Sequence, residues 1–192
     1  MKIPLSLLIR GFFVSLQKKI MMTIEQLQTN EYHSYYQLYL DKVGNFDLLE
    51  GLRQNGKLTA QFLESIPEET YDYAYAKDKW TIKEVVQHII DTERIFTYRA
   101  LSFARHDTTA LPGYDQDQYA ETCQANRRTK KSLIDEYKAL RQASLVLYES
   151  FTDEMLLQIG NASHSDVSVR AIGFILIGHE NHHAQIIKER YL

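Results

Sequence analysis

Apolar residues recur every three or four positions in four long stretches of the chain, a spacing that is typical of amphipathic α-helices. The stretches cover 46–66, 81–105, 127–151 and 168–192. No stretch alternates apolar and polar residues for long enough to build a sheet. Four long amphipathic helices without strands predict an all-α protein that folds as a four-helix bundle.

Several residues mark the ends of these helices. Pro67 ends the first helix. Thr81 and Glu84 form a T-x-x-E capping box at the start of the second, and Ser168 can cap the start of the fourth. The connection over 106–125 contains a Pro-Gly turn signal and is long for an antiparallel hairpin. We therefore expect it to cross the end of the bundle and reach a parallel neighbour.

The segments between the long helices are shorter and more polar. The tyrosine-rich segment 23–43 is expected to form a short helix or an arm. A helical turn is predicted to begin at Thr152 and to be capped by Gly160. The polar segment 161–167 is expected to be a loop.

Composition narrows the class of protein. The length of 192 residues favours one domain, which we place at 23–192. The net charge is −3 with both signs interspersed, so the sequence offers no basic surface for nucleic acid. The single cysteine, Cys123, leaves no partner for an intrachain disulfide, which fits a reducing compartment. We expect a cytoplasmic protein without a membrane partner.

The first 22 residues differ from the rest of the chain. We interpret 1–22 as a non-native or disordered extension, with translation starting at Met21 or Met22. Its apolar run faintly resembles an export signal, but Arg10 interrupts that run and lysines stand where a cleavage site should be. An amphipathic tail is a further alternative. The segment is too short and too charged to span a bilayer.

The last helix carries two histidines on the face that should point into the core. On a helical wheel one stripe contains Ile172, Leu176, His179, His183 and Ile186. Two imidazoles four positions apart lie on one helix face and can chelate a single ion. The alternative is a pair of core histidines held by hydrogen bonds.

A third histidine can complete this site. His88 lies on the flank of the buried stripe of the second helix and, taken alone, is better interpreted as a boundary residue. Together with His179 and His183 it could hold one divalent ion, because neutral imidazole suits zinc, nickel, cobalt or iron(II). Three protein ligands leave a position for water or substrate, as in catalytic rather than structural zinc sites.

The residues His179 to His183 also match the H-E-x-x-H signature of zinc proteases. Only nine residues follow His183, so the downstream third ligand of those enzymes has no room. We therefore expect Glu180 to have a role behind the ligands or at the surface. His182 lies at the edge of the stripe and is a weaker candidate for a ligand or an acid–base group.

Other polar side chains complete the list of candidates. Glu93 interrupts the buried stripe of the second helix and needs a cationic partner, for which we consider Arg170. Asp91 could hydrogen-bond a ligand histidine or lie at the surface. Cys123 has no paired base and is not expected to be a nucleophile. The remaining histidines fall in polar segments and are expected to be solvated: His33, His106 and His164.

Four motifs, in this order, resemble the DinB family in its YfiT-like branch. They lie at 79–93, 111–117, 169–171 and 178–183, within a match over 45–192. The resemblance implies a four-helix bundle in up-down-down-up order. It also implies one divalent metal bound by three histidines, which fall on His88, His179 and His183. Zinc or nickel is the first expectation, with cobalt, manganese or iron next.

The resemblance implies enzymes that act on small molecules. Relatives include S-transferases that use bacillithiol or mycothiol, a thiol-dependent isomerase, and proteins assigned as metal-dependent hydrolases. The expected reaction is transfer of a low-molecular-weight thiol, of the bacillithiol, mycothiol or glutathione type, to an electrophilic substrate. Arg99 or Arg170 could bind an acidic group of the thiol, or pair with Glu93. A hydrolase and a non-catalytic metal-binding stress-response module are the alternatives.

A homodimer is a further expectation. Phe174 and Ile177 put apolar area on the side of the last helix opposite the histidines. The same two residues could instead pack under the amino-terminal arm.

Overall fold

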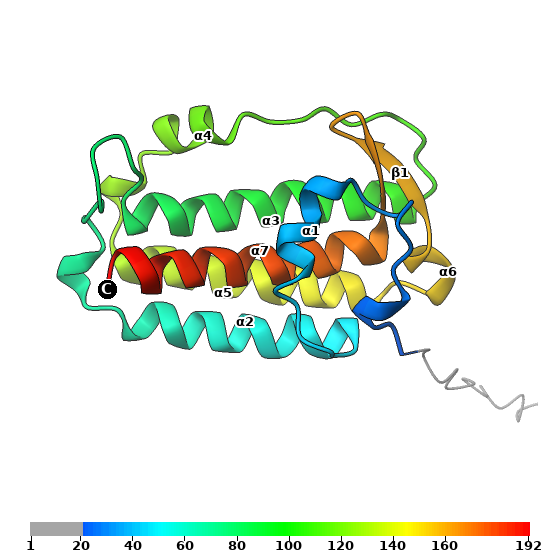
Figure 1. The fold of residues 1–192 in the computed structure, drawn as a ribbon, viewed down its shortest axis with the longest axis horizontal. Coiled ribbons are helices and arrows are strands. Elements are labelled where there is room, and N and C mark those ends of the chain that lie inside the picture. The colour runs from blue at the N-terminus through cyan, green and yellow to red at the C-terminus, as the bar shows by residue number, and fades with distance from the viewer. Residues whose placement is uncertain (1–20) are drawn as a thin grey trace, which may run out of the picture.

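The computed structural model describes residues 21–192. Four long helices form a bundle (Figure 1): α2 (Leu48–Ser65), α3 (Ile82–Ala104), α5 (Lys130–Glu149) and α7 (Val169–Arg190). Helices α3 and α5 run in the same direction, and α2 and α7 run in the opposite one (Figure 1). The predicted all-α, up-down-down-up bundle is confirmed.

The long connection between α3 and α5 explains this order. It carries α4 (Gln116–Thr122) and the short helix η5 (Ala125–Arg127), and it runs back along the length of the bundle (Figure 1). Helix α5 can therefore start at the same end as α3. The parallel neighbour was predicted, but the connection follows the side of the bundle rather than crossing its end.

Two hydrophobic clusters fill the bundle. One lies toward α1 (Gln37–Leu40) and contains Tyr39, Leu52, Phe103 and Phe174. The other lies toward the carboxyl end of the chain and contains Leu63, Val86, Tyr137 and Ile187.

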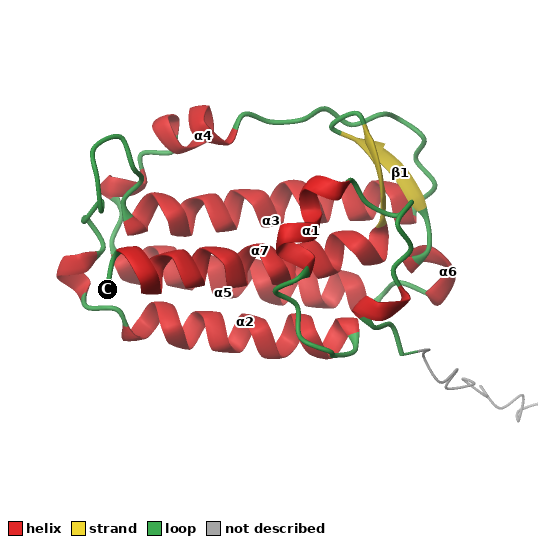
Figure 2. Ribbon diagram, viewed as in Figure 1, coloured by secondary structure: helices red, strands yellow, loops and turns green. Residues whose placement is uncertain are grey.

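A small β-hairpin replaces the loop predicted at 161–167 (Figure 2). Strands β1 (Ile159–Ala162) and β2 (Ser165–Ser168) pair antiparallel. The turn between them, Ser163 and His164, has positive φ at both residues, without the glycine that usually signals such a turn. The helical turn predicted at Thr152 is confirmed as α6 (Asp153–Leu156), but Gly160 lies inside β1 and does not cap it.

The segment before α2 forms short helices, as predicted: η2 (Ile24–Gln26), η3 (Ser34–Tyr36) and α1. Helix α1 packs against α7. Within the proposed extension 1–22, residues 1–20 lie outside the described residues, and Met22 is buried in the core. One further short helix, η4 (Glu68–Thr70), follows α2.

Phe174 and Ile177 are buried, in the cluster that also contains Met22, Tyr39 and Leu40. They pack inside the molecule rather than on an exposed face. The expectation of a homodimer depended on these two residues being exposed, so the structure removes that argument. The homodimer itself stays an untested prediction.

The buried carboxylate of Glu93 is paired with Arg141 of α5, not with Arg170 or Arg99 as expected. Arg141 Nε and Nη2 donate to the two oxygens of Glu93, each at 2.9 Å. Arg170 instead donates from Nε to Oε2 of Glu31 at 2.7 Å. Arg170 stands in the first turn of α7, where its side chain reaches the amino-terminal segment, whereas Arg141 is at the middle of the bundle.

Arg141 needs a glycine on the facing helix. A Cβ at Gly56 of α2 would lie 2.6 Å from Cγ of Arg141. Gly56 is thus the place on α2 where the side chain of Arg141 enters the bundle. On α5 the buried face includes Arg141, Leu145 and Tyr148, while Leu140 and Leu147 are half-buried.

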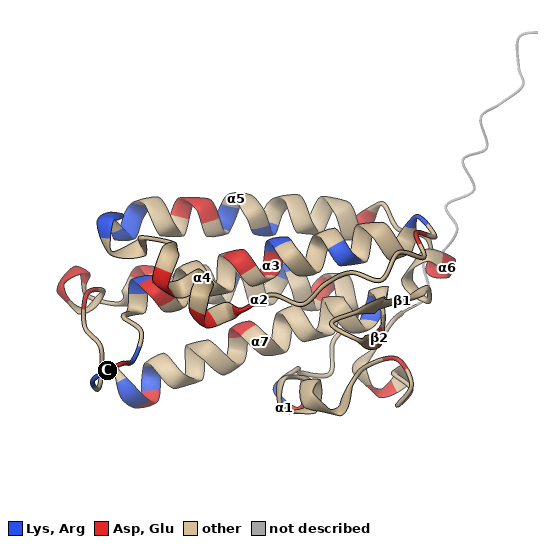
Figure 3. Cartoon of the chain, turned by 90° about the horizontal axis from the view of Figure 1, so that it is seen from above, with Lys and Arg blue, Asp and Glu red and all other residues tan. Residues whose placement is uncertain are grey.

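Charges of both signs are scattered along the helices (Figure 3). Within 21–192, no helix combines the length and the apolar character needed to cross a membrane.

Candidate metal centre

The three candidate histidines come from two antiparallel neighbours, α3 and α7. The capping box starts α3 as predicted: Thr81 Oγ1 accepts from the Glu84 amide at 3.2 Å, and Glu84 Oε2 accepts from the Thr81 amide at 2.7 Å. Ser168 caps α7 by accepting from the Ala171 amide at 3.0 Å. These caps set where each helix begins and hence which side chains face each other.

The structure brings the three imidazoles together with their Nε2 atoms converging. Nε2 of His179 lies 3.0 Å from Nε2 of His88 and 3.1 Å from Nε2 of His183. One ring nitrogen from each residue lies within 4.8 Å of the other two. His88 and His179 are buried, and His183 is half-buried.

Hydrogen bonds among the rings do not account for this arrangement. In a neutral imidazole each nitrogen is either a donor or an acceptor. Nε2 of His179 faces two other Nε2 atoms, so one lone pair would have to serve two donors, or one N–H two acceptors. An ion at the centre satisfies all three lone pairs at once. Two nitrogens bound tetrahedrally to zinc at about 2.0–2.1 Å lie about 3.3 Å apart, close to the separations seen here.

The electrostatic environment keeps these rings neutral. Burial lowers the pKa of His88 to about 4. Burial, together with the neighbouring imidazoles, holds the pKa of His179 and of His183 well below the usual value. Neutral imidazole is the form that binds metal ions, so the residues present fit a divalent cation. Ligation by His88, His179 and His183 remains a prediction.

Aromatic rings pack around the cluster. The Trp80 ring lies 5.0 Å from that of His88, centroid to centroid. The Tyr39 ring of α1 lies 5.2 Å from that of His179 and 5.3 Å from that of His182. These contacts hold the imidazoles in place from two sides.

Two clefts reach the cluster. The first, which we call the tyrosine cleft, has a volume of about 180 Å³ and is lined by Tyr35, Tyr36, Tyr39, Thr92, Phe96, Arg99, Tyr114, Gln116, Ser163, Ile175, Leu176 and His179. The second, the tryptophan cleft, has a volume of about 210 Å³, and its lining includes Trp80, Asp117, His183 and Tyr191. A small molecule can therefore approach either His179 or His183.

A model of the DinB superfamily matches residues 52–187 of the chain. The chain belongs to the DinB superfamily. A protein of Oceanobacillus iheyensis, provisionally named a metal-dependent hydrolase, is 27% identical to it over 153 residues, which cover 77% of this chain and 87% of that protein.

A solved structure has a similar fold. YfiT from Bacillus subtilis, described as a probable metal-dependent hydrolase with an unusual four-helix bundle topology, matches this DinB-superfamily chain with a TM-score of 0.68. The match covers 85% of this chain and 90% of YfiT at 19% identity. At that identity the likeness shows the fold.

The other candidates of this DinB-superfamily chain lie away from the three nitrogens. Glu180 is buried among α2, α5 and α7, so a surface role is wrong; it accepts from Asn55 at 2.6 Å and from Tyr137. His182 is half-buried and contacts the rings of Tyr39 and His183. Its role as a ligand or acid–base group is untested.

Asp91 and Cys123 do not join the cluster. Asp91 is half-buried and accepts from Gln87 Nε2 at 2.9 Å rather than from His88. Burial raises the pKa of the Cys123 thiol, the opposite of what an activated nucleophile needs. The histidines expected to be solvated are exposed: His33, His106 and His164.

Sequence reasoning missed the walls of the site. Tyr39, Trp80 and Tyr114 line the clefts, but no helical stripe marks them. The signal available was the density of tyrosines before α2, together with the motif that contains Tyr114. Neither says which ring faces the histidines, because that depends on how α1 and the α3–α5 connection pack.

Gly178 brings α1 close to the cluster. A Cβ at this position would overlap the carbonyl oxygen of Tyr39, which is backbone and cannot move aside. Gly178→Ala is expected to destabilise the fold by about 1–3 kcal/mol. We expect a fall of several degrees in the midpoint of thermal unfolding, at about 2–4 °C per kcal/mol.

The matched control for Gly178→Ala is Gly51→Ala on α2, where the nearest atom is the movable Cδ1 of Ile177 at 3.0 Å. Alanine is better than glycine in a helix by about 1 kcal/mol. A Gly178→Ala variant that melts at or above the wild-type temperature would therefore contradict the close approach of α1.

Proposed function

We propose that this DinB-superfamily protein is a metal-dependent hydrolase whose single divalent ion is held by His88, His179 and His183. The observation that carries the proposal is the convergence of three neutral imidazole nitrogens at a point reached by two clefts. The names given to the Oceanobacillus protein and to YfiT support it. Zinc or nickel is the expected ion, with cobalt, manganese or iron next.

A divalent ion with three imidazole ligands supplies Lewis acidity: it lowers the pKa of a water or thiol and polarises a carbonyl. The chain supplies the rest. Buried His88 and His179 present neutral nitrogens, and the rings of Trp80 and Tyr39 fix their orientation. Three protein ligands leave a coordination position for a reactant, which favours a catalytic site over a non-catalytic metal-binding module.

Transfer of a low-molecular-weight thiol is the second candidate, and one observation favours it. None of the described residues that line the tyrosine cleft is a carboxylate, so a reactant that enters by this cleft finds no carboxylate general base for water; Asp78 and Asp117 line only the tryptophan cleft. A thiol ionises far more readily than water, with a pKa of about 8.5 for cysteine. A thiol at this site would therefore need less help from a base, and an electrophilic substrate would be its partner.

The test removes and restores the ion. Protein stripped with a chelator is expected to lose hydrolysis of a panel of esters, amides and lactones by about 10³-fold or more, because Lewis acidity contributes several kcal/mol. Adding back zinc, nickel, cobalt, manganese or iron(II) one at a time should restore the rate. Elemental analysis of each sample measures the metal content.

A parallel set of reactions contains thiols and electrophiles. Turnover only when a thiol is added, with the thiol found in the product, would assign thiol transfer instead of hydrolysis. A chain that carries one ion and turns over neither set would support the non-catalytic module. Hydrolysis that survives complete removal of metal would contradict the proposal.

A further inference from the structure

Arg99 is a buried arginine without a carboxylate partner. It is 3% exposed, and its Nη2 donates to the Pro112 carbonyl at 2.9 Å and to Ser163 Oγ at 3.0 Å. Its guanidinium also lies 4.9 Å from the centroid of the Phe96 ring. All these partners are neutral, and no ion pair joins Arg99 to a carboxylate within 21–192.

The other buried arginines behave differently. Arg141 pairs with Glu93 and Glu180, and Arg170 pairs with Glu31. An unpaired buried cation costs several kcal/mol of stability, so a chain that needed Arg99 only for packing would have gained from an uncharged residue. Burial accordingly lowers the pKa of Arg99. A charged group that is buried in a cleft and has a perturbed pKa marks a candidate functional site.

The position of Arg99 shows where that ligand lies. Arg99 and His179 line the same tyrosine cleft, and His88 and Arg99 both belong to the buried face of α3. Eleven residues of helix separate their Cα atoms by about 16 Å. The Arg99 guanidinium lies over the ring of Phe96, about one turn of α3 nearer to His88. A molecule that touches both the ion and Arg99 spans on the order of 10 Å.

We infer that Arg99 is the anion-recognition residue of the substrate site, and that the substrate is an elongated small molecule whose carboxylate binds Arg99 while its reacting group lies at the three histidines. The inference rests on the proposed function, because it places the reacting group at the ion. Guanidinium matches the planar carboxylate through paired N–H groups.

The rest of the cleft fits the same ligand. The hydroxyl groups of Tyr36 and Tyr114 interact with the Arg99 charge, and Ile175 and Leu176 supply an apolar wall in the cleft that also contains His179. Burial raises the pKa of Tyr36 and of Tyr114, so both hydroxyls stay protonated and can donate to an anion. An aliphatic chain that ends in a carboxylate therefore finds both apolar and hydrogen-bonding partners in this cleft.

The test measures binding of defined probes to the whole chain, both metal-free and zinc-loaded. Binding of hexanoate, of the neutral hexanamide and of inorganic phosphate is measured for the wild type and each variant by isothermal titration calorimetry. In the wild type, the Arg99 Nε–H signal in nuclear magnetic resonance titrations shows whether each probe binds at Arg99. Hexanoate is expected to shift this signal and to bind about tenfold more tightly than hexanamide, as for other charge-assisted hydrogen bonds. Arg99→Gln should reduce hexanoate binding to the level of hexanamide.

Arg94→Gln is the matched control. It removes one positive charge from the same helix, but Arg94 is half-exposed and pairs with Glu136. Hexanoate binding by this variant should equal that of the wild type. Phosphate binding that depends on Arg99 while hexanoate binding does not would assign a phosphate as the anion.

Other outcomes separate this inference from the proposed function. Equal binding of every probe by wild type and Arg99→Gln, or no binding to either form of the protein, would overturn the inference. If neither Arg99→Gln nor Arg99→Lys folds, as judged by circular dichroism, the arginine is structural and the inference is also overturned. Metal-dependent hydrolysis that ignores a substrate carboxylate would leave the proposed function intact. If hexanoate binding depends on Arg99 but the protein never holds a metal ion, Arg99 is an anion-binding residue and the proposed metal-dependent hydrolase is contradicted.

Discussion

The double variant His179→Ala, His183→Ala is expected to bring metal content from about one divalent ion per chain to none. Zinc sites with four ligands bind with about 10–16 kcal/mol, so each ligand contributes roughly 3 kcal/mol. Losing two of three imidazoles should weaken binding on the order of 10⁴-fold. Elemental analysis of untagged protein and calorimetric titration with zinc both measure this change.

Unfolding gives an independent readout. An ion that binds the folded chain raises stability by about 2.7 kcal/mol at a free concentration one hundred times its dissociation constant. Zinc should therefore raise the midpoint of thermal unfolding of the wild type and leave that of the double variant unchanged. The double variant is expected to keep its fold without metal, because only one of the three converging imidazoles is left in the core.

His182→Ala is the control for this experiment. His182 contacts the rings of Tyr39 and His183, but its nitrogens are not among the converging set. The His182→Ala variant should retain the ion. Loss of the ion from this variant would identify His182 as a ligand. Wild-type protein that takes up no divalent ion after reconstitution, with its fold intact, would make the three histidines core residues.

The histidine site could be predicted because helical periodicity is a local property. The spacing of His179 and His183 already places both rings on one buried face. His88 was harder to assign, since one histidine on the flank of a stripe looks like a boundary residue. It joins the set only because α3 and α7 are neighbours with a fixed register. The resemblance to the DinB family supplied that pairing, which the spacing alone did not.

The features that were not predicted depend on contacts distant in sequence. The sequence shows that Glu93 needs a cation, but Arg99, Arg141 and Arg170 all have the correct charge. The choice among them depends on which helices pack around Glu93. The hairpin was missed for a local reason: its strands are only four residues long, and Ser163 and His164 adopt positive φ without glycine.

Substitution of Arg141 is expected to have a large effect on the stability of the fold. Its guanidinium binds Glu93 of α3 in a bidentate manner, Glu180 of α7 at 2.9 and 3.0 Å, and the Leu52 carbonyl of α2 at 3.3 Å. One side chain of α5 thus links all four helices. Burial alone would lower the pKa of Arg141, but the carboxylates of Glu180 and Glu93 raise it well above the usual value.

Arg141→Met is therefore expected to lower the free energy of unfolding by about 3–5 kcal/mol, because it leaves two carboxylates buried without a cation. That is a large part of the roughly 5–15 kcal/mol that stabilises an ordinary domain. Urea denaturation followed by circular dichroism measures the change. Adding Glu93→Gln to Arg141→Met should recover part of the loss, since one fewer charge is then unpaired.

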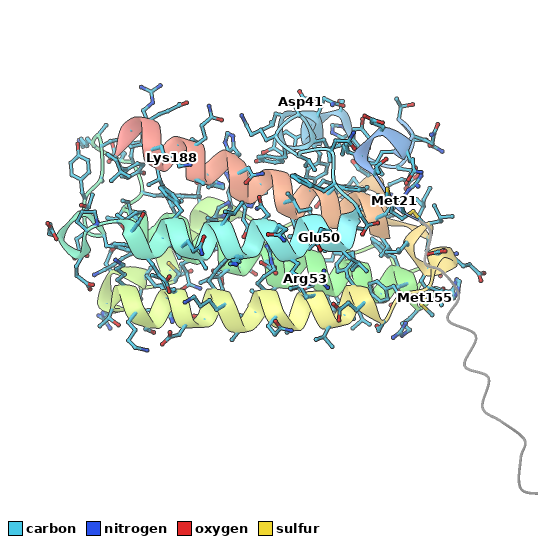
Figure 4. All side chains as sticks on the ribbon, turned by 90° about the horizontal axis from the view of Figure 1, so that it is seen from below. Met21, Asp41, Glu50, Arg53, Met155 and Lys188 are labelled. Carbon is cyan, nitrogen blue, oxygen red and sulfur yellow. The ribbon has the colours of Figure 1, made fainter. Side chains whose placement is uncertain are left out.

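Arg53→Met separates the effect of burial from that of charge. Arg53 also joins α2 to α5, through Glu149 at 2.7 Å, and contacts Glu50 at 2.9 Å on the outer surface (Figure 4). Because the Arg53 side chain is 49% exposed, the ion pair between Arg53 and Glu149 should contribute less than about 1 kcal/mol to the free energy of unfolding. Similar losses for Arg53→Met and Arg141→Met would mean that the central carboxylates do not depend on the guanidinium. A loss confined to Arg141→Met would identify this charge cluster as what joins the four helices beside the histidine site.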